Sequence, residues 1–191
     1  MIEIVPFASL GRAEHGWLSA RFHFSFAEYY NPKRVGFGPL LVWNDDTIQA
    51  GGGFPMHPHR DMEIITYVRS GAISHEDHLG NRGRTEAGDV QVMSAGTGIM
   101  HSEVNQETEP TTLFQIWIQP HTQRVEPRWE QRRFPKGDRA GQLVPLASGP
   151  SCSSRVGVSG DAARTRRRCV GSSSPRLRRS HWQPWPSAST W

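Results

Sequence analysis

Two short stretches of the sequence carry side chains that could bind a metal. His57 and His59 lie two residues apart, and His101 and Glu103 repeat this spacing about 40 residues later. In a β-strand, side chains at i and i+2 point to the same face, roughly 6–7 Å apart. If both stretches lie on facing walls of a small barrel, three imidazoles and one carboxylate converge. Such a set suits a divalent transition metal and leaves room for water or substrate.

The alternative interpretation is structural. Pairs of histidines two apart also occur by chance, and the four groups could be hydrogen-bonded residues inside a barrel, or part of a surface hairpin. The metal interpretation is favoured because burying so much polarity without a metal is costly. Two of the remaining histidines, His75 and His78, flank an expected hairpin. The others have no partner at ligand spacing, so all six are expected to be structural or solvent-facing: His15, His23, His75, His78, His121 and His181.

The charge of the chain is divided unevenly. The whole sequence carries a net charge of +4, but residues 149–191 hold eight arginines and one aspartate, whereas residues 1–148 hold 14 basic and 17 acidic residues. Nucleic-acid binding through the folded part is therefore not indicated. The segment 149–191 is rich in Ser, Arg and Pro and has no apolar period, so we predict a disordered basic tail rather than a nucleic-acid-binding arm.

Several classes of protein are disfavoured by the rest of the composition. The first residues lack the basic and apolar regions of a secretion signal, and no apolar run approaches the ~18 residues of a membrane span. We therefore expect a cytoplasmic protein with no membrane partner. Both cysteines, Cys152 and Cys169, lie in the tail, so the main part of the chain offers no thiolate metal ligand.

Short segments rich in β-branched and aromatic residues recur about every ten residues between glycine-containing turns, which predicts an antiparallel sandwich or barrel. Asn44-Asp45-Asp46 is expected to turn out of the strand Leu40–Trp43. Residues 120–135 are polar and are expected to end the first module, with residues 128–134 as a solvated connector. No segment before residue 120 shows a helical period. The expected strands include Leu40–Trp43, Glu63–Val68, Ile73–Asp77, Val90–Met93 and Leu113–Ile118.

The spacing around the candidate ligands resembles the two cupin motifs. Gly51, His57-x-His59 and Glu63 resemble the first, and Gly98-x-x-His101-x-x-x-Asn105 resembles the second, although its usual proline is absent. The resemblance to the pirin family covers residues 1–147. The stretches that carry it are His57-Pro58-His59-Arg60-Asp61-Met62-Glu63, Leu79-Gly80-Asn81-Arg82-Gly83, Ser94 to Glu103, Phe114 to Ile118 and Glu130 to Phe134.

This resemblance implies an all-β cupin fold, a double-stranded β-helix or jelly-roll barrel. Pirins contain two such barrels, and here the second is expected to be incomplete. The implied organisation is an N-terminal cupin domain over 1–135 that holds the metal, the start of a second cupin domain over 136–148, and the tail over 149–191.

The resemblance also implies which side chains bind the metal. In pirins the ligands correspond to His57, His59, His101 and Glu103, and the metal is usually iron. One divalent ion is therefore expected, with Fe(II) first and Ni, Cu, Mn or Zn as other choices. Glu63 stands in phase with the first two histidines and is the ligand in many other cupins, but here it is expected to support the site from outside the ligand set.

The function implied is that of a metal-dependent dioxygenase of quercetin-type flavonols, with O2 as the second substrate. Glu103 is then a candidate catalytic residue, either as a ligand only or also as the base that takes the flavonol proton. Two alternatives stay open. One is an iron-binding, redox-sensing regulator with a protein partner and no turnover, and the other is an inactive, truncated pirin.

Overall fold

The computed structural model describes residues 2–134, 136–137 and 143–148. Contacts within the chain divide it into two units, Met1–Ala147 and Ser148–Trp191. The predicted tail, 149–191, lies outside the described residues. The residues of 143–148 form no strand or helix, so the predicted start of a second barrel stays a prediction.

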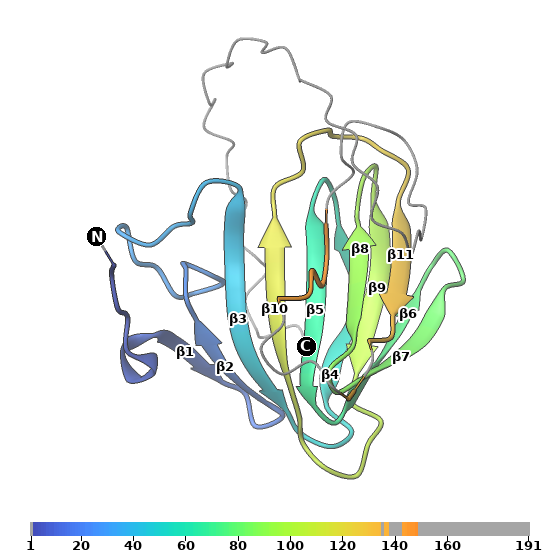
Figure 1. Ribbon diagram of the computed structural model, residues 1–191, viewed down its shortest axis with the longest axis horizontal. Helices are drawn as coiled ribbons and strands as arrows, with labels where there is room; N and C mark the ends of the chain where they lie inside the picture. The colour runs from blue at the N-terminus through green and yellow to red at the C-terminus, as the bar shows by residue number, and fades with distance from the viewer. Residues whose placement is uncertain (1, 135, 138–142, 149–191) are drawn as a thin grey trace. The chain divides into compact units, whose positions relative to one another are not determined.

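The described part of the first unit is built from strands, with one short 3-10 helix, η1 (Phe7–Ser9), near its start (Figure 1). The predicted all-β class is confirmed. The strands are β1 (Gly11–Glu14), β2 (Leu18–Phe22), β3 (Leu40–Ile48), β4 (Gly53–His59), β5 (Glu63–Ser70), β6 (Ala72–Asp77), β7 (Arg82–Glu86), β8 (Val90–Ser94), β9 (Ile99–Val104), β10 (Thr111–Ile118) and β11 (Arg128–Arg132).

The strands form two antiparallel sheets. One has seven strands in the order β1-β2-β3-β10-β5-β8-β11, and the other has four in the order β4-β9-β6-β7. Neighbours such as β3 and β10 are far apart in sequence, so the sheets are not simple series of hairpins. Together they give the cupin type of barrel that the sequence predicts.

The apolar core lies between the two sheets. Ile48, Val68 and Leu113 of the seven-stranded sheet are fully buried in one cluster with Ile73 of the four-stranded sheet. Each strand can contribute in this way because its side chains alternate between the interior and the outside. In β3, for example, Val42 and Ile48 are buried while the residues between alternate in exposure.

Two local predictions were wrong. Asn44-Asp45-Asp46 does not leave the first strand but continues it, since β3 extends to Ile48. Asn44 and Asp46 point to the buried face of the strand, and that face is partly polar. The polarity of the three residues was therefore not the sign of an exposed turn. Residues 128–134 are also not a simple connector, because Arg128–Arg132 pairs with β8 as β11.

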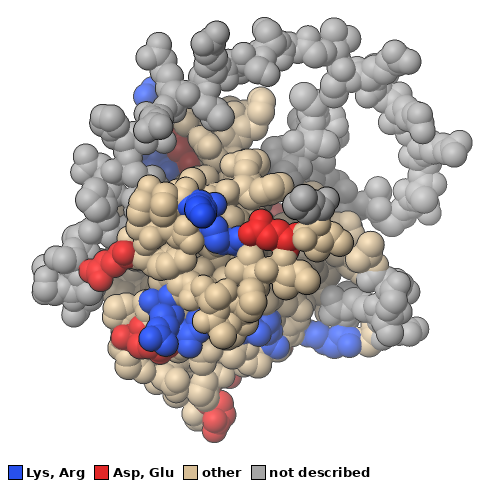
Figure 2. Space-filling view, turned by 90° about the vertical axis from the view of Figure 1, so that its left-hand side faces the viewer, with Lys and Arg blue, Asp and Glu red and all other residues tan. Residues whose placement is uncertain are grey.

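On the face shown in Figure 2, basic and acidic side chains are interspersed among other residues over the described region. Among the residues that the structure describes, no helix has the length and apolar character needed to cross a membrane.

Candidate metal centre

Strands β4 and β9 bring the candidate ligands together. His57 is the direct antiparallel partner of His101, and their ring centroids are 4.5 Å apart. His59, two residues along β4, has its ring 4.7 Å from that of His57 and 5.0 Å from that of His101. One nitrogen from each ring can be chosen so that all three atoms lie within 4.8 Å of one another. The three rings therefore face a common point that one ion could occupy.

Glycine allows the two strands to approach closely near this point. A Cβ atom on Gly53, at the start of β4, would lie 2.3 Å from the carbonyl oxygen of Glu103 and 2.6 Å from Cα of Val104. Those are backbone atoms of the paired strand and cannot move aside as a flexible side chain would. The residue type at position 53 thus sets how close β4 lies to the ligand-bearing part of β9.

The site favours neutral imidazoles, the form that binds metals. Burial lowers the pKa of all three histidines because it penalises the charged ring. The pKa of His59 falls to about 3 and that of His101 to about 2, and neighbouring histidines lower both further. The pKa of His57 is also lowered, mainly by burial.

Hydrogen bonds indicate which nitrogen of two rings is available to a metal. His57 Nδ1 lies 2.7 Å from the carbonyl oxygen of Pro55, which can only accept, so Nδ1 carries the hydrogen and Nε2 the lone pair. His101 Nε2 is buried and has no hydrogen-bond partner among the described residues. A buried nitrogen left in this way is costly unless something binds it, and a metal ion fits both the atom and its neutral neighbours.

Glu103 lies on the same strand as His101 and points to the same buried interior, but its carboxylate is not part of the histidine group. Gln115 Nε2 donates to Oε2 at 2.9 Å, and Thr66 Oγ1 donates to Oε1 at 3.1 Å. Gln91 Nε2 also donates to Oε1. These three donors come from the opposite, seven-stranded sheet. The structure thus gathers three of the four predicted ligands, and the place of Glu103 in the set stays a prediction.

The carboxyl of Glu103 is nevertheless unusual. Burial raises its pKa to about 7, and the hydrogen bonds from Thr66, Gln115 and Gln91 only partly offset this. A carboxyl with such a pKa exchanges its proton near neutral pH, which is what a general base requires.

Glu63 is in a different position. It is half-buried at the start of β5 and accepts a hydrogen bond from Ser94 Oγ at 2.7 Å. Thr66, which donates to Glu103, is three residues away and therefore lies on the opposite face of β5. Glu63 points away from the interior that holds Glu103. Its place outside the ligand set stays a prediction.

The sequence interpretation gave no chemical role to His75, but the structure puts it beside the site. Its side chain is fully buried, and its Nδ1 lies 3.3 Å from Nδ1 of His101. A signal was present: His75 and Asp77 show the same two-residue spacing as the ligand pairs. The same segment also fits the expected hairpin, so this spacing alone does not mark a site.

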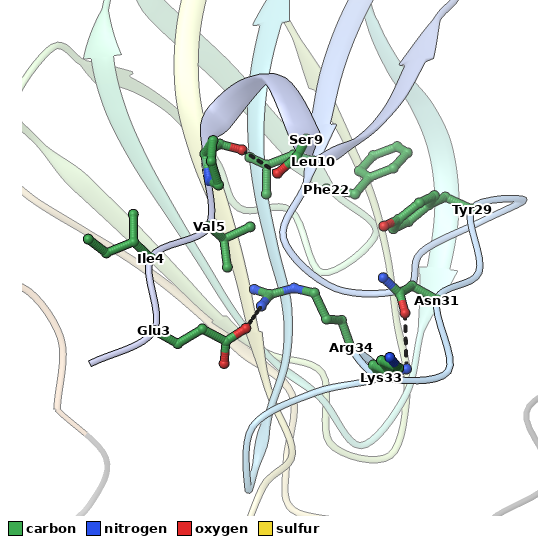
Figure 3. A pocket seen from close by; sticks show the side chains of 11 residues that line it. Glu3, Ile4, Val5, Ser9, Leu10, Phe22, Tyr29, Asn31, Lys33 and Arg34 are labelled. Atoms are coloured by element: carbon green, nitrogen blue, oxygen red, sulfur yellow. Dashed lines mark hydrogen bonds and ion pairs between the residues drawn. The ribbon is translucent and has the colours of Figure 1, made fainter. Parts of the chain in front are cut away.

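One surface pocket borders the histidine group and another does not. The first, of about 340 Å³, lies between the N-terminal segment and residues such as Phe22, Tyr29 and Arg34 (Figure 3). None of the three clustered histidines lines it. The second, of about 330 Å³, includes His59 together with Arg60, His78 and Met100 among its lining residues. Only the second pocket borders the candidate centre.

Fold and site together define an all-β protein of the cupin class, with three histidines clustered on two paired strands. Residues 6–118 match the Pirin family. The chain therefore belongs to the pirin family, as the sequence motifs predicted.

Individual relatives agree with this assignment. The chain is 62% identical over 149 residues to a pirin-like protein of Caulobacter vibrioides, covering 78% of this chain and 64% of that protein. It is 55% identical over 125 residues to a quercetin 2,3-dioxygenase of Escherichia coli K12, covering 65% and 54%. The crystal structure of the E. coli pirin YhhW in complex with nickel(II) is 48% identical, with a TM-score of 0.66, covering 72% of this chain and 64% of that one. The chain thus spans somewhat over half the length of these relatives.

Proposed function

We propose that this chain is a metal-dependent dioxygenase that acts on quercetin-type flavonols with O2. The observation that carries the proposal is the cluster of three buried histidines, in which His101 Nε2 has no hydrogen-bond partner among the described residues. The relative of E. coli named quercetin 2,3-dioxygenase supports the reaction, and the nickel complex of YhhW supports a metal at this site. Fe(II) is the metal that we propose, on the family resemblance.

In this proposal His57, His59 and His101 hold the ion as neutral ligands. Their lowered pKa values keep them uncharged at neutral pH, so little energy is needed to remove protons before metal binding. The bound ion would act as a Lewis acid that lowers the pKa of a flavonol hydroxyl and holds it beside O2.

Glu103 is proposed as the fourth ligand and as the catalytic base. Gln91, Gln115 and Thr66 orient its carboxylate, as second-layer donors commonly orient metal-binding carboxylates. With a pKa of about 7, the carboxylate could take the proton of the substrate hydroxyl at neutral pH. Both roles use the same oxygen atoms, so they would follow one another rather than act together.

The second pocket supports access for a small molecule. It borders His59 and is lined by the half-exposed Met100 and by Ile99 and Pro58, a mixed apolar surface on which an aromatic ring could rest. Aromatic and apolar linings with a few polar groups are typical of small-molecule sites.

The proposal is tested on the full chain in two steps. Elemental analysis of purified protein should find about one equivalent of a transition metal in the wild type and none in a His57→Ala/His101→Ala double variant. Metal-loaded wild type in air should then consume quercetin, seen as loss of the flavonol absorption band. Soluble wild type that binds no metal after reconstitution would refute the proposal. Tight metal binding without quercetin loss would favour the redox-sensing regulator instead.

A further inference from the structure

A chain of contacts extends from His101 away from the clustered histidines. His101 Nδ1 lies 3.3 Å from Nδ1 of His75, and Nε2 of His75 lies 3.1 Å from Oδ2 of Asp77. The side chains of His75 and Asp77 have no exposed surface. None of these contacts is therefore shared with solvent, and each atom must find its hydrogen or its lone pair within the chain.

The carboxylate at the far end fixes the positions of the hydrogens. An ionised carboxylate only accepts, so His75 must donate from Nε2. A neutral imidazole has one N–H, which leaves a lone pair on Nδ1 of His75. His101 must then donate from its own Nδ1, and its lone pair falls on Nε2. That is the buried atom with no partner among the described residues.

Asp77 is held so that it keeps this role. Its Oδ1 accepts from the backbone nitrogens of Leu79 and Asn81, both at 3.0 Å, and its Oδ2 accepts from Asn81 Nδ2 at 2.9 Å. These donors stabilise the ionised form and lower the pKa of Asp77, although burial opposes them. The carboxylate is thus an acceptor toward every neighbour named here.

His75 is also fixed in orientation. The indole ring of Trp129 stacks on it with a centroid distance of 4.7 Å and an interplanar angle of 10°. Trp129 reaches this place because residue 83 on β7 is glycine, where a Cβ atom would lie 2.2 Å from the indole. The imidazole plane, and with it the direction of the bond toward His101, is set by packing on β11 and β7.

We propose that His75 and Asp77 are positioning residues that select the tautomer and ring orientation in which His101 binds the metal. The proposal rests on the metal centre of the proposed function and deepens it. Hydrogen bonds from a ligand histidine to an outer group commonly change metal affinity by roughly 10- to 100-fold. Here the outer group is a second histidine, and its own tautomer is set by a carboxylate one step further out.

The opposite arrangement is chemically possible and gives opposite results. If His75 were protonated on both nitrogens, it would donate to His101 Nδ1, and His101 would carry its hydrogen on Nε2. The ring would then have to lose or move that hydrogen before it could bind a metal. His75 and Asp77 would in that case be a buried ion pair that stabilises the fold and hinders metal binding.

The first experiment needs no metal. In the ¹⁵N-labelled full chain, two-bond proton–nitrogen spectra distinguish the two neutral tautomers and the imidazolium form, with His75→Gln and His101→Gln used for assignment. We expect the hydrogen on Nδ1 in His101 and on Nε2 in His75. A hydrogen on Nε2 of His101, or a doubly protonated His75, would overturn the proposal.

The second experiment inverts the chain of contacts without removing volume. In Asp77→Asn, the amide oxygen in place of Oδ1 can still accept from the backbone of Leu79 and Asn81 and from Asn81 Nδ2, which lies 3.2 Å from Oδ1. The amide nitrogen in place of Oδ2 no longer accepts from Asn81, but it donates to His75 and reverses its tautomer. The matched control is Glu76→Gln, the same loss of charge one residue away, where the exposed carboxylate pairs with Arg82 at 2.7 Å. His75→Phe keeps a ring that can stack on Trp129 but removes both nitrogens.

Calorimetric titration with nickel(II) provides the comparison. We expect Asp77→Asn and His75→Phe to bind nickel about 10- to 100-fold more weakly than wild type, and Glu76→Gln to bind it equally. Unfolding midpoints of the metal-free proteins separate a loss of nickel affinity from a loss of folding. If His75 and Asp77 were purely structural, the variants would have lower midpoints and unchanged nickel affinity. Wild type without nickel binding would overturn the proposed function and this inference together. Wild type and Asp77→Asn with equal affinity would overturn this inference alone.

Discussion

His57 and His101 face each other across paired antiparallel strands, with ring centroids 4.5 Å apart, although the two residues belong to strands separated by four others in the chain. An ion bound between them would connect β4 to β9, and His59 would add a second bond from β4. The three histidines are buried, and the strand pairing that brings them together exists only in the folded state. Metal binding should therefore stabilise the fold.

The first prediction concerns this coupling. Nickel(II) at about 100 times its dissociation constant should stabilise the wild type by about 2.7 kcal/mol, because the unfolded chain does not hold the three nitrogens together. His101→Ala should lose nearly all of this gain. Unfolding in denaturant with and without nickel measures it, and His121→Ala, at an exposed site, serves as the control. An equal gain in stability from nickel in His101→Ala and His121→Ala would contradict binding at this site.

The second prediction uses the high pKa of Glu103. Below its pKa of about 7 the metal-free carboxyl is protonated, so a metal that binds the carboxylate must displace a proton. Apparent nickel affinity should fall about 50-fold from pH 7 to pH 5 in the wild type, because half of the carboxyl is already protonated at pH 7. His59 and His101 are neutral over that range, so they add nothing to the pH dependence of the nickel affinity. Affinity measured across this range should vary much less in Glu103→Gln. Equal slopes would show that Glu103 is not a ligand.

The third prediction tests the approach of β4 to β9. Gly53→Ala places a methyl group against the backbone of Glu103 and Val104 and should cost more than about 2 kcal/mol of stability. Gly80→Ala is the control, because its Cβ would meet no atom within 4 Å and only its φ of +89° is unfavourable for alanine. That should cost about 1 kcal/mol. Urea unfolding of both variants compares them, and equal losses would refute the close-contact argument.

The fourth prediction concerns Asp46, whose buried Oδ1 has no hydrogen-bond partner among the described residues. Burial and, less strongly, the charge of Glu103 raise its pKa well above the ordinary value of 3.8. The folded state therefore keeps a proton that the unfolded chain loses, and this contribution to stability declines as the pH rises above 3.8.

Asp46→Asn removes that dependence, since an amide does not titrate. Wild type should thus lose stability relative to Asp46→Asn as the pH is raised from 4 to 7, by up to about 1.4 kcal/mol per unit. Thermal unfolding of the metal-free proteins at several pH values gives the difference. Parallel curves would mean that Asp46 is ionised in the folded state.

The sequence alone was sufficient for the class of fold and for the histidine pairs. Both follow from local rules: short β-rich segments between glycine turns predict strands, and a two-residue spacing puts His57 and His59 on one face. The resemblance to pirins added the family. Local rules failed at Asn44-Asp45-Asp46, where polar residues were interpreted as a turn, because they ignore that the interior of this barrel is itself polar around Glu103.

Tertiary structure alone decided which groups meet. Pairing of β4 with β9 sets His57 against His101, and pairing of β6 with β9 puts His75 beside His101, a contact that no spacing along the chain contains. The opposite sheet supplies the donors that hold the Glu103 carboxylate. The physical reason is that strand periodicity fixes only the face on which a side chain lies. The partner on that face depends on sheet order and register, which are set by packing of the whole core.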